Sequence, residues 1–233
     1  LEISADIDPA KTDSEFSEKQ HGVITYTGTG SSNSVTGLGF QPDLVIIKNR
    51  DGTQGTKITD SSRGVTKVLQ APTSSAESTD SNGLTAFGSD GFTVGSDAGY
   101  NGSGNGMVAW CWKANGGTTA SNSDGSITST VQANTKSGFS IVQYTGVSTA
   151  TTATVGHGLG KAPTFIIHKV LNSTGYHFVR GVPGMTSATT VRDFNPNGSP
   201  TDISGSGGAL VAPTSTVFNI NNYTGIGGGG FNY

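Results

Sequence analysis

The residues best suited to metal chemistry are the four histidines, His21, His157, His168 and His177. None of them stands at HxH or HxxxH spacing to another, and zinc needs three or four convergent ligands. His168 lies inside an apolar strand pattern, next to Ile167. The sequence therefore predicts no metal site, and it places the histidines in turns or on strand surfaces.

Carboxylates are sparse, at 16 Asp and Glu in 233 residues. A glycosidase needs a positioned pair of them, and the candidates lie in predicted loops: Asp60, Glu77, Asp80 and Asp90. Asp51 and Asp97 stand close to glycines, as in fragments of calcium loops, but the spacing of five or more oxygen ligands is missing. We therefore predict neither a catalytic pair nor a calcium site.

Nucleophile and phosphate-binding motifs are also missing. No Gly-x-Ser-x-Gly elbow joins a strand to a helix, and the glycine runs Gly102–Gly106 and Gly225–Gly230 lack the Lys-Ser/Thr of a phosphate loop. The turn that starts at His157, His-Gly-Leu-Gly, occurs earlier in the chain as Thr36-Gly-Leu-Gly. Because Thr can replace His there, the position suits packing or capping better than catalysis. We predict no catalytic, metal or cofactor-binding residue and no cofactor.

One cysteine, Cys111, excludes an internal disulfide and a thiolate metal cage. Because Trp110 and Trp112 flank it, we expect a buried, structural thiol. The two tryptophans share one strand face and Cys111 points to the other. Aromatic side chains that alternate with small residues are more often core than sugar-stacking platforms, so we expect core positions for Trp110, Trp112, Tyr26, Tyr100, Tyr144, Tyr176 and Tyr223.

The elements that would position these residues occur twice. Tyr26-Thr-Gly, followed by the segment Gly37–Lys48, returns as Tyr144-Thr-Gly followed by Gly158–Lys169. Both copies retain Gly-Leu-Gly, a proline and an apolar run that ends in lysine. A segment present twice in one chain indicates a duplicated structural unit.

The pattern predicts an all-β protein. No window shows the helical stripe of apolar residues over ten positions, and short apolar runs are separated by Gly, Asn, Asp and Ser. We expect two tandem, antiparallel β-sandwich-like units. The run Leu44–Lys48 is apolar enough for a strand covered on both faces. Other strands are predicted at Leu1–Asp8, His21–Tyr26, Val65–Gln70, Leu84–Phe87, Phe92–Val94, Met107–Trp112, Ile127–Val131, Phe139–Tyr144 and Val217–Ile220.

The predicted domain organisation is a first unit at 1–115, with an N-terminal strand and connector at 1–20, a linker at 116–126, and a second unit at 127–233. No counterpart of Met107–Trp112 follows Tyr223 to Gly230. The second unit would then lack its last strand and expose a sheet edge. We expect the native polypeptide to continue, or a neighbouring chain to fill the gap.

Composition excludes several classes of protein. Charged residues make up 12% of the chain, the net charge is -3 and the pI is about 5.7, so there is no basic footprint for nucleic acid. No window approaches the ~20 apolar residues of a membrane helix, and no signal peptide is visible. Compact apolar runs at low net charge argue for a folded protein and against disorder.

A characteristic order of motifs runs through segments 37–50, 60–64, 90–95, 108–113, 124–129 and 156–160. This order resembles a repeat domain found in virion proteins of marine bacteriophages, in tail-fibre or head-fibre genes. The resemblance covers roughly residues 22–233, and its motifs become degraded or missing in the second unit. It implies a β-rich fold and a location in the virion, with no catalytic residue to transfer.

We therefore expect a non-enzymatic structural protein of a phage particle, in a fibre, knob, or capsid or tail appendage, which contributes to host attachment. Its expected partners are other copies of itself, in a homo-oligomer, and other virion proteins. The alternative is a carbohydrate-binding module that recognises a host-surface glycan through an exposed aromatic side chain. A polysaccharide-degrading enzyme ranks last.

Overall fold

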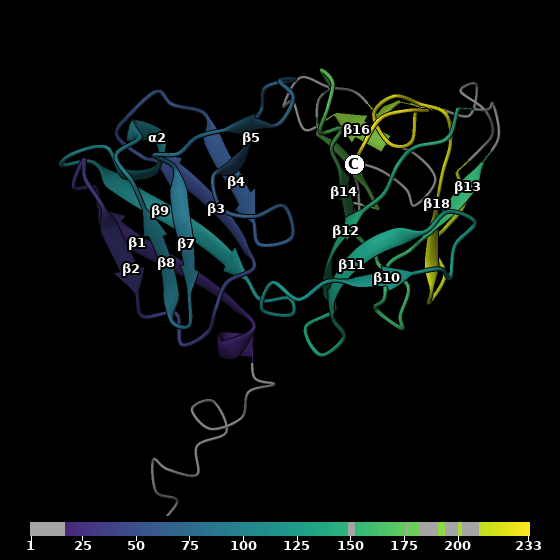
Figure 1. Ribbon diagram of the computed structural model, residues 1–233, viewed down its shortest axis with the longest axis horizontal. Coiled ribbons are helices and arrows are strands. Elements are labelled where there is room, and N and C mark those ends of the chain that lie inside the picture. Colours follow the sequence, from purple (N-terminus) through teal and green to yellow (C-terminus); the bar gives the residue numbers. More distant parts are fainter. Residues whose placement is uncertain (1–16, 149–151, 176, 182–190, 194–199, 202–209) are drawn as a thin grey trace, which may run out of the picture. The chain divides into compact units, whose positions relative to one another are not determined.

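In the computed structural model of the protein (Figure 1), the residues described are 17–148, 152–175, 177–181, 191–193, 200–201 and 210–233. The predicted all-β fold is confirmed, and every described pair of named strands runs antiparallel. Among these described residues, helix is confined to η2 (Ser17–Lys19) and α2 (Ala98–Asn101). No helix in these ranges is long and apolar enough to cross a bilayer. The strand predicted at Leu1–Asp8 and the aromatic Tyr176 lie outside the described residues.

The chain divides into two compact units. The first contains residues up to Val68 and Ser78–Thr118, and the second contains Leu69–Glu77 and Thr119–Tyr233. The segment Leu69–Glu77 joins the second unit because the Glu77 amide donates to the Leu171 carbonyl. The predicted linker at 116–126 is partly strand, since its residues 120–122 pair with the next strand. These residues lack large apolar side chains because they form an exposed edge.

The first unit, purple to teal in Figure 1, has two sheets, with strand orders β1-β9-β3-β4-β5-β6 and β2-β8-β7. These sheets contain β1 (His21–Thr27), β2 (Asn33–Thr36), β3 (Leu44–Asn49), β4 (Thr56–Asp60), β5 (Lys67–Ala71), β6 (Ser78–Thr79), β7 (Leu84–Gly88), β8 (Gly91–Val94) and β9 (Gly106–Trp112). The last three residues of β5 belong to the segment Leu69–Glu77 of the second unit.

The core of the first unit lies between these two sheets. Alternate residues of β9 point inward, and Met107, Ala109 and Cys111 are fully buried. From the smaller sheet, Leu84 and Phe92 pack into the same cluster. The alternation follows from the pleat of a strand, in which successive side chains point to opposite faces.

The strand β3 corrects one expectation. Val45 and Ile47 are buried at 1% and 0% exposure, whereas Leu44 and Ile46 are only half-buried. The apolar run is therefore covered fully on one face and partly on the other. On the outer face, Ile46 lies directly opposite Trp110 of β9.

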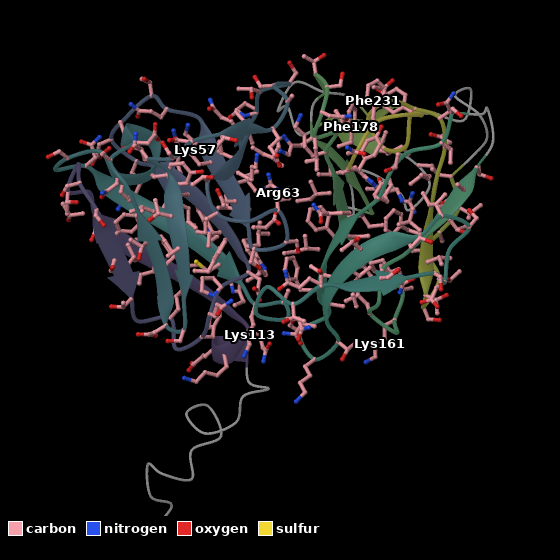
Figure 2. All side chains as sticks on the ribbon, viewed as in Figure 1. Lys57, Arg63, Lys113, Lys161, Phe178 and Phe231 are labelled. Carbon is pink, nitrogen blue, oxygen red and sulfur yellow. The ribbon has the colours of Figure 1, made fainter. Side chains whose placement is uncertain are left out.

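The second unit contains strands grouped as β10-β11-β12, β13-β18 and β14-β15-β16-β17. These are β10 (Ala120–Asn122), β11 (Ser129–Asn134), β12 (Phe139–Gln143), β13 (Ala153–Gly156), β14 (Ile166–His168), β15 (Phe178–Arg180), β16 (Val191–Asp193), β17 (Pro200–Thr201) and β18 (Val217–Ile220). In the described part of this unit, two buried clusters form the core, one around Val155 and Phe218 and one around Phe178 and Ile226. Figure 2 labels Phe178.

The two units repeat the same contacts around equivalent tyrosines. In the first, Val35 pairs with Phe92, whose ring meets Tyr26 edge-on at 6.2 Å between centroids. In the second, Val155 pairs with Phe218, whose ring meets Tyr144 edge-on at 5.9 Å.

Hydrogen bonds of the repeated tyrosine and lysine also correspond. The hydroxyl of Tyr26 donates to the Tyr100 carbonyl at 2.5 Å, and that of Tyr144 donates to the Ile226 carbonyl at 2.6 Å. The repeated lysines, Lys48 and Lys169, each donate to the carbonyl six residues later, at 2.5 Å in both units. The repeated sequence thus specifies the same closure of a strand by the loop that follows it.

Candidate functional site

The most buried carboxylate of the first unit, Asp43, holds a loop together. One oxygen accepts hydrogen bonds from the Ala114 and Gly116 amides at 2.7 and 3.0 Å. The other accepts from the Gly117 amide at 2.9 Å and the Ser61 hydroxyl at 2.7 Å. With Asp43 at 0% exposure, four donors occupy the carboxylate, which leaves it unsuited to act as a base or nucleophile.

The Gly-Leu-Gly turn is closed by Asp90. Its carboxylate accepts from the Gly37 and Gly39 amides at 3.0 and 2.5 Å. Both glycines have positive φ, at 106° and 72°, which side chains rarely adopt. The Asp90-Gly and Gly-Leu-Gly motifs, far apart in sequence, are thus two halves of one structural contact.

In the second unit His157 closes the same turn. Its Nδ1 accepts from the Leu159 amide at 3.2 Å, so Nε2 carries the proton and donates to the Thr214 carbonyl at 3.2 Å. Burial lowers the pKa of His157, consistent with a neutral ring. The capping role expected for His157 is what the structure shows.

The remaining acids named from the sequence also support loops. Asp60 forms a 2.5 Å ion pair with Arg63, which Figure 2 labels, and both side chains are below 10% exposed. Asp97 caps α2 through the Gly99 amide at 2.8 Å. Asp51 accepts from the Gly106 amide and Asp80 from the Asn82 amide. Within the ranges that the structure describes, no three His, Cys, Asp or Glu residues gather into a metal-binding group.

The tryptophans correct the expectation for the aromatic side chains. Tyr100 and Tyr144 are buried as expected, and burial raises the pKa of each phenol. Trp110 and Trp112, however, lie half-buried on the outer face of the six-stranded sheet. Cys111 takes the inward position between them, and burial raises the pKa of its thiol to about 12. The thiol is therefore structural, and the indoles belong to a surface.

This surface, here called the Trp face, is an apolar part of the outer sheet. Along one row Val23, which is 54% exposed, lies opposite Trp110, and Trp110 lies opposite Ile46. In the next row the ring of His21 meets that of Trp112 at 4.9 Å between centroids. The outer face of this sheet thus carries the partly exposed apolar side chains Val23, Trp110 and Trp112.

The histidine expectation is wrong for His168, which lies in strand β14 and is buried, whereas His157 lies in a turn as expected. His157, His168 and His177 are buried at 1–3% exposure, and only His21 is on the surface. His168 has the most unusual surroundings. Burial, with the Arg180 charge nearby, lowers its pKa to about 3, so this ring stays neutral.

Tyr144 fixes the tautomer of His168. The Tyr144 hydroxyl donates to the Ile226 carbonyl and therefore accepts from Nδ1 of His168 at 3.0 Å. Its Nε2 is then a bare acceptor, for which the described residues offer no partner.

Arg180, at 1% exposure, is the second unusual group. It donates to the carbonyls of Asn219 and Val211 at 2.8 and 3.4 Å, and its Nε has no partner among the described residues. No carboxylate of the described residues forms an ion pair with Arg180, and burial lowers the pKa of Arg180 to about 10. Burying a charge without a counter-charge costs several kcal/mol.

A hollow of about 350 Å³ is lined in part by Arg180. Pro163, Thr164, Ile166 and Pro213 contribute to its mostly apolar wall. The sequence patterns considered above do not predict this hollow. A comparison of the two repeated units could have indicated it. The register of β14 and β15 puts His168 and Arg180 where β3 and β4 have Ile47 and Thr59.

These features define a duplicated all-β protein whose motif acids maintain loops. The chain belongs to the family described as a domain of unknown function (DUF7483), which it matches over residues 16–231. No curated protein and no solved structure matched the chain.

Proposed function

We propose that this protein is a non-enzymatic structural component of a bacteriophage particle, in a fibre, knob, or capsid or tail appendage, and that it contributes to host attachment. The observation that carries the proposal is the use of the motif carboxylates. Asp43, Asp60 and Asp90 each hold a loop through hydrogen bonds. Carboxylates used in this way support a scaffold whose role is to hold a defined shape.

The repeat supports the same proposal. Two units built on one set of contacts, with few charges and glycine-rich turns, suit a protein that is displayed on a particle. The motif order resembles that of phage virion proteins over most of the chain. Several copies in one particle would bind together, so that weak single contacts combine into strong attachment. Closed symmetric assemblies are the usual form of such oligomers.

Mass spectrometry of a phage whose genome encodes the chain tests the proposal. In particles banded on a density gradient, we expect its peptides at several copies per particle. The proposal would be overturned if the chain were found only in the soluble part of the lysate and were absent from banded particles.

A carbohydrate-binding module is the second candidate, and the Trp face favours it. Indole rings that point away from the core are the groups on which sugar rings stack. A glycan array tests this candidate with the wild-type chain and with Trp110→Ala, using Phe87→Ala in the other sheet as the control. Binding that Trp110→Ala abolishes and Phe87→Ala retains would support it, and an array without binders would exclude it.

A further inference from the structure

The first unit shows how its last strand completes the large sheet. β9 lies between β1 and β3 and pairs with both. At its start, Met107 pairs with Tyr26, and the Gly106 carbonyl accepts from the Arg50 amide at 2.9 Å.

The second unit begins the same arrangement with Asn232 and Tyr233. Tyr233 exchanges both backbone hydrogen bonds with Tyr144, at 3.1 and 2.9 Å, and the Asn232 carbonyl accepts from the Leu171 amide at 2.7 Å. Asn232 and Tyr233 thus correspond to Gly106 and Met107. Beyond this start, β12 and β14 are edges of their own sheets, and no strand of the described residues lies between them.

The outer side of this position is apolar and exposed. Phe165 and Ile167 are exposed at 51% and 46%. Their counterparts in the first unit, Leu44 and Ile46, are half-buried and lie opposite the two tryptophans of β9. A strand between β12 and β14 would cover Phe165 and Ile167 with its own outward side chains.

The inner side of the position is hollow. In the first unit Val45 is 1% exposed and lies opposite Cys111, which is fully buried. Its counterpart Ile166 is only half-buried and lines the 350 Å³ hollow together with Arg180. An inward side chain of the size of Cys111 would occupy part of that space.

We propose that the edges of β12 and β14 form a strand-acceptor site, and that its occupant is an extended polypeptide strand that enters in line with Tyr233. The occupant has small or apolar residues facing inward and large apolar or aromatic residues facing outward, as Gly106–Trp112 does. Two open backbone edges require a partner with its own regularly spaced N–H and C=O groups. A sugar or a lipid lacks them. This proposal rests on the fold and is independent of the proposed function.

Site-resolved hydrogen exchange tests the proposal on three samples of the full chain. The first is unmodified, the second has the sequence Val108–Ala114 fused after Tyr233, and the third has the same extension with proline at its second and fourth positions. Proline cannot donate a ladder hydrogen bond. A fourth sample contains the unmodified chain with a free peptide of residues 106–114.

By the alternation of strand edges, the amides of Val142 and Ile167 face the acceptor site, as those of Ile24 and Ile46 face β9. We expect fast exchange at Val142 and Ile167 in the unmodified chain. The fused strand slows both at least about 100-fold, towards the rates of Ile24 and Ile46, and the proline extension does not. Slowing by the free peptide supports the same site without a covalent link.

Slowing that increases with the concentration of the unmodified chain would also support an acceptor site, with a second copy as the donor of the strand. Fast exchange at both amides with the fused strand and with the peptide would overturn the proposal. Slow exchange in the dilute, unmodified chain would overturn it as well, because the two edges would then be closed already.

Discussion

Removal of the Asp43 carboxylate should destabilise the first unit strongly, because that group maintains a loop. In Asp43→Ala the Ala114, Gly116 and Gly117 amides and the Ser61 hydroxyl all lose their acceptor. Each such loss costs about 1 kcal/mol, and more where the acceptor is charged and the donor stays buried. We expect a loss of roughly 3–5 kcal/mol in the free energy of unfolding.

Two matched variants separate this role from a general effect of mutation. Asp43→Asn keeps the shape and one acceptor oxygen but turns an NH2 group towards backbone donors, so we expect an intermediate loss of about 2 kcal/mol. Ser61→Ala removes one donor and leaves the three backbone bonds, and should cost about 1 kcal/mol.

Urea unfolding followed by tryptophan fluorescence measures these losses. The chain has only two tryptophans, both in β9 of the first unit, so the signal reports that unit alone. For Asp43→Ala the midpoint should fall by about 2 M or more at an ordinary denaturant dependence. A loss below about 1 kcal/mol, or an Asp43→Asn variant as stable as the wild type, would refute the structural role.

Three further predictions concern other buried groups. The pKa of His168 is about 3 in the folded chain and about 6.5 in the unfolded chain, so stability that is fully present above pH 6.5 is lost as the pH falls from 6.5 towards 3, by about 2 kcal/mol at pH 5. The variant His168→Ile, which introduces the residue found at the equivalent position of the first unit, should remove this loss when unfolding is followed by circular dichroism. Cys111 should react with a thiol reagent at pH 8 only after unfolding, and rapid reaction of the folded chain would contradict its burial. Tyr26→Phe and Tyr144→Phe should each cost about 1–2 kcal/mol, each in its own unit by hydrogen exchange, and equal losses in both units would contradict separate cores.

The sequence predicted the fold where apolar alternation is strong and failed where pairing depends on a partner. β1, β3 and β9 follow their apolar patterns closely. β2 and β4 consist mainly of polar residues, and each contributes few buried side chains. They are strands because neighbouring strands complete their hydrogen bonds, which local propensity does not reveal.

The site residues show the same limit. Period-two alternation predicts that Cys111 and the tryptophans lie on opposite faces of one strand. Which of these faces meets the core depends on the second sheet. Burial of His168 and Arg180 was not predictable from their surroundings in the sequence. Position-by-position comparison of the two copies would have indicated them, because a duplicated core rarely exchanges Ile47 and Thr59 for charged or titratable groups.

Immunogold electron microscopy of intact phage particles tests the central claim most directly, with antibodies raised against the recombinant chain. The particles come from a phage that encodes the protein, and a phage that lacks the gene is the control. We predict gold at a regular position on the surface of the particles, on a fibre, knob, or capsid or tail appendage. Gold confined to the host cell or to soluble material, with bare particles, would contradict a structural role in the virion.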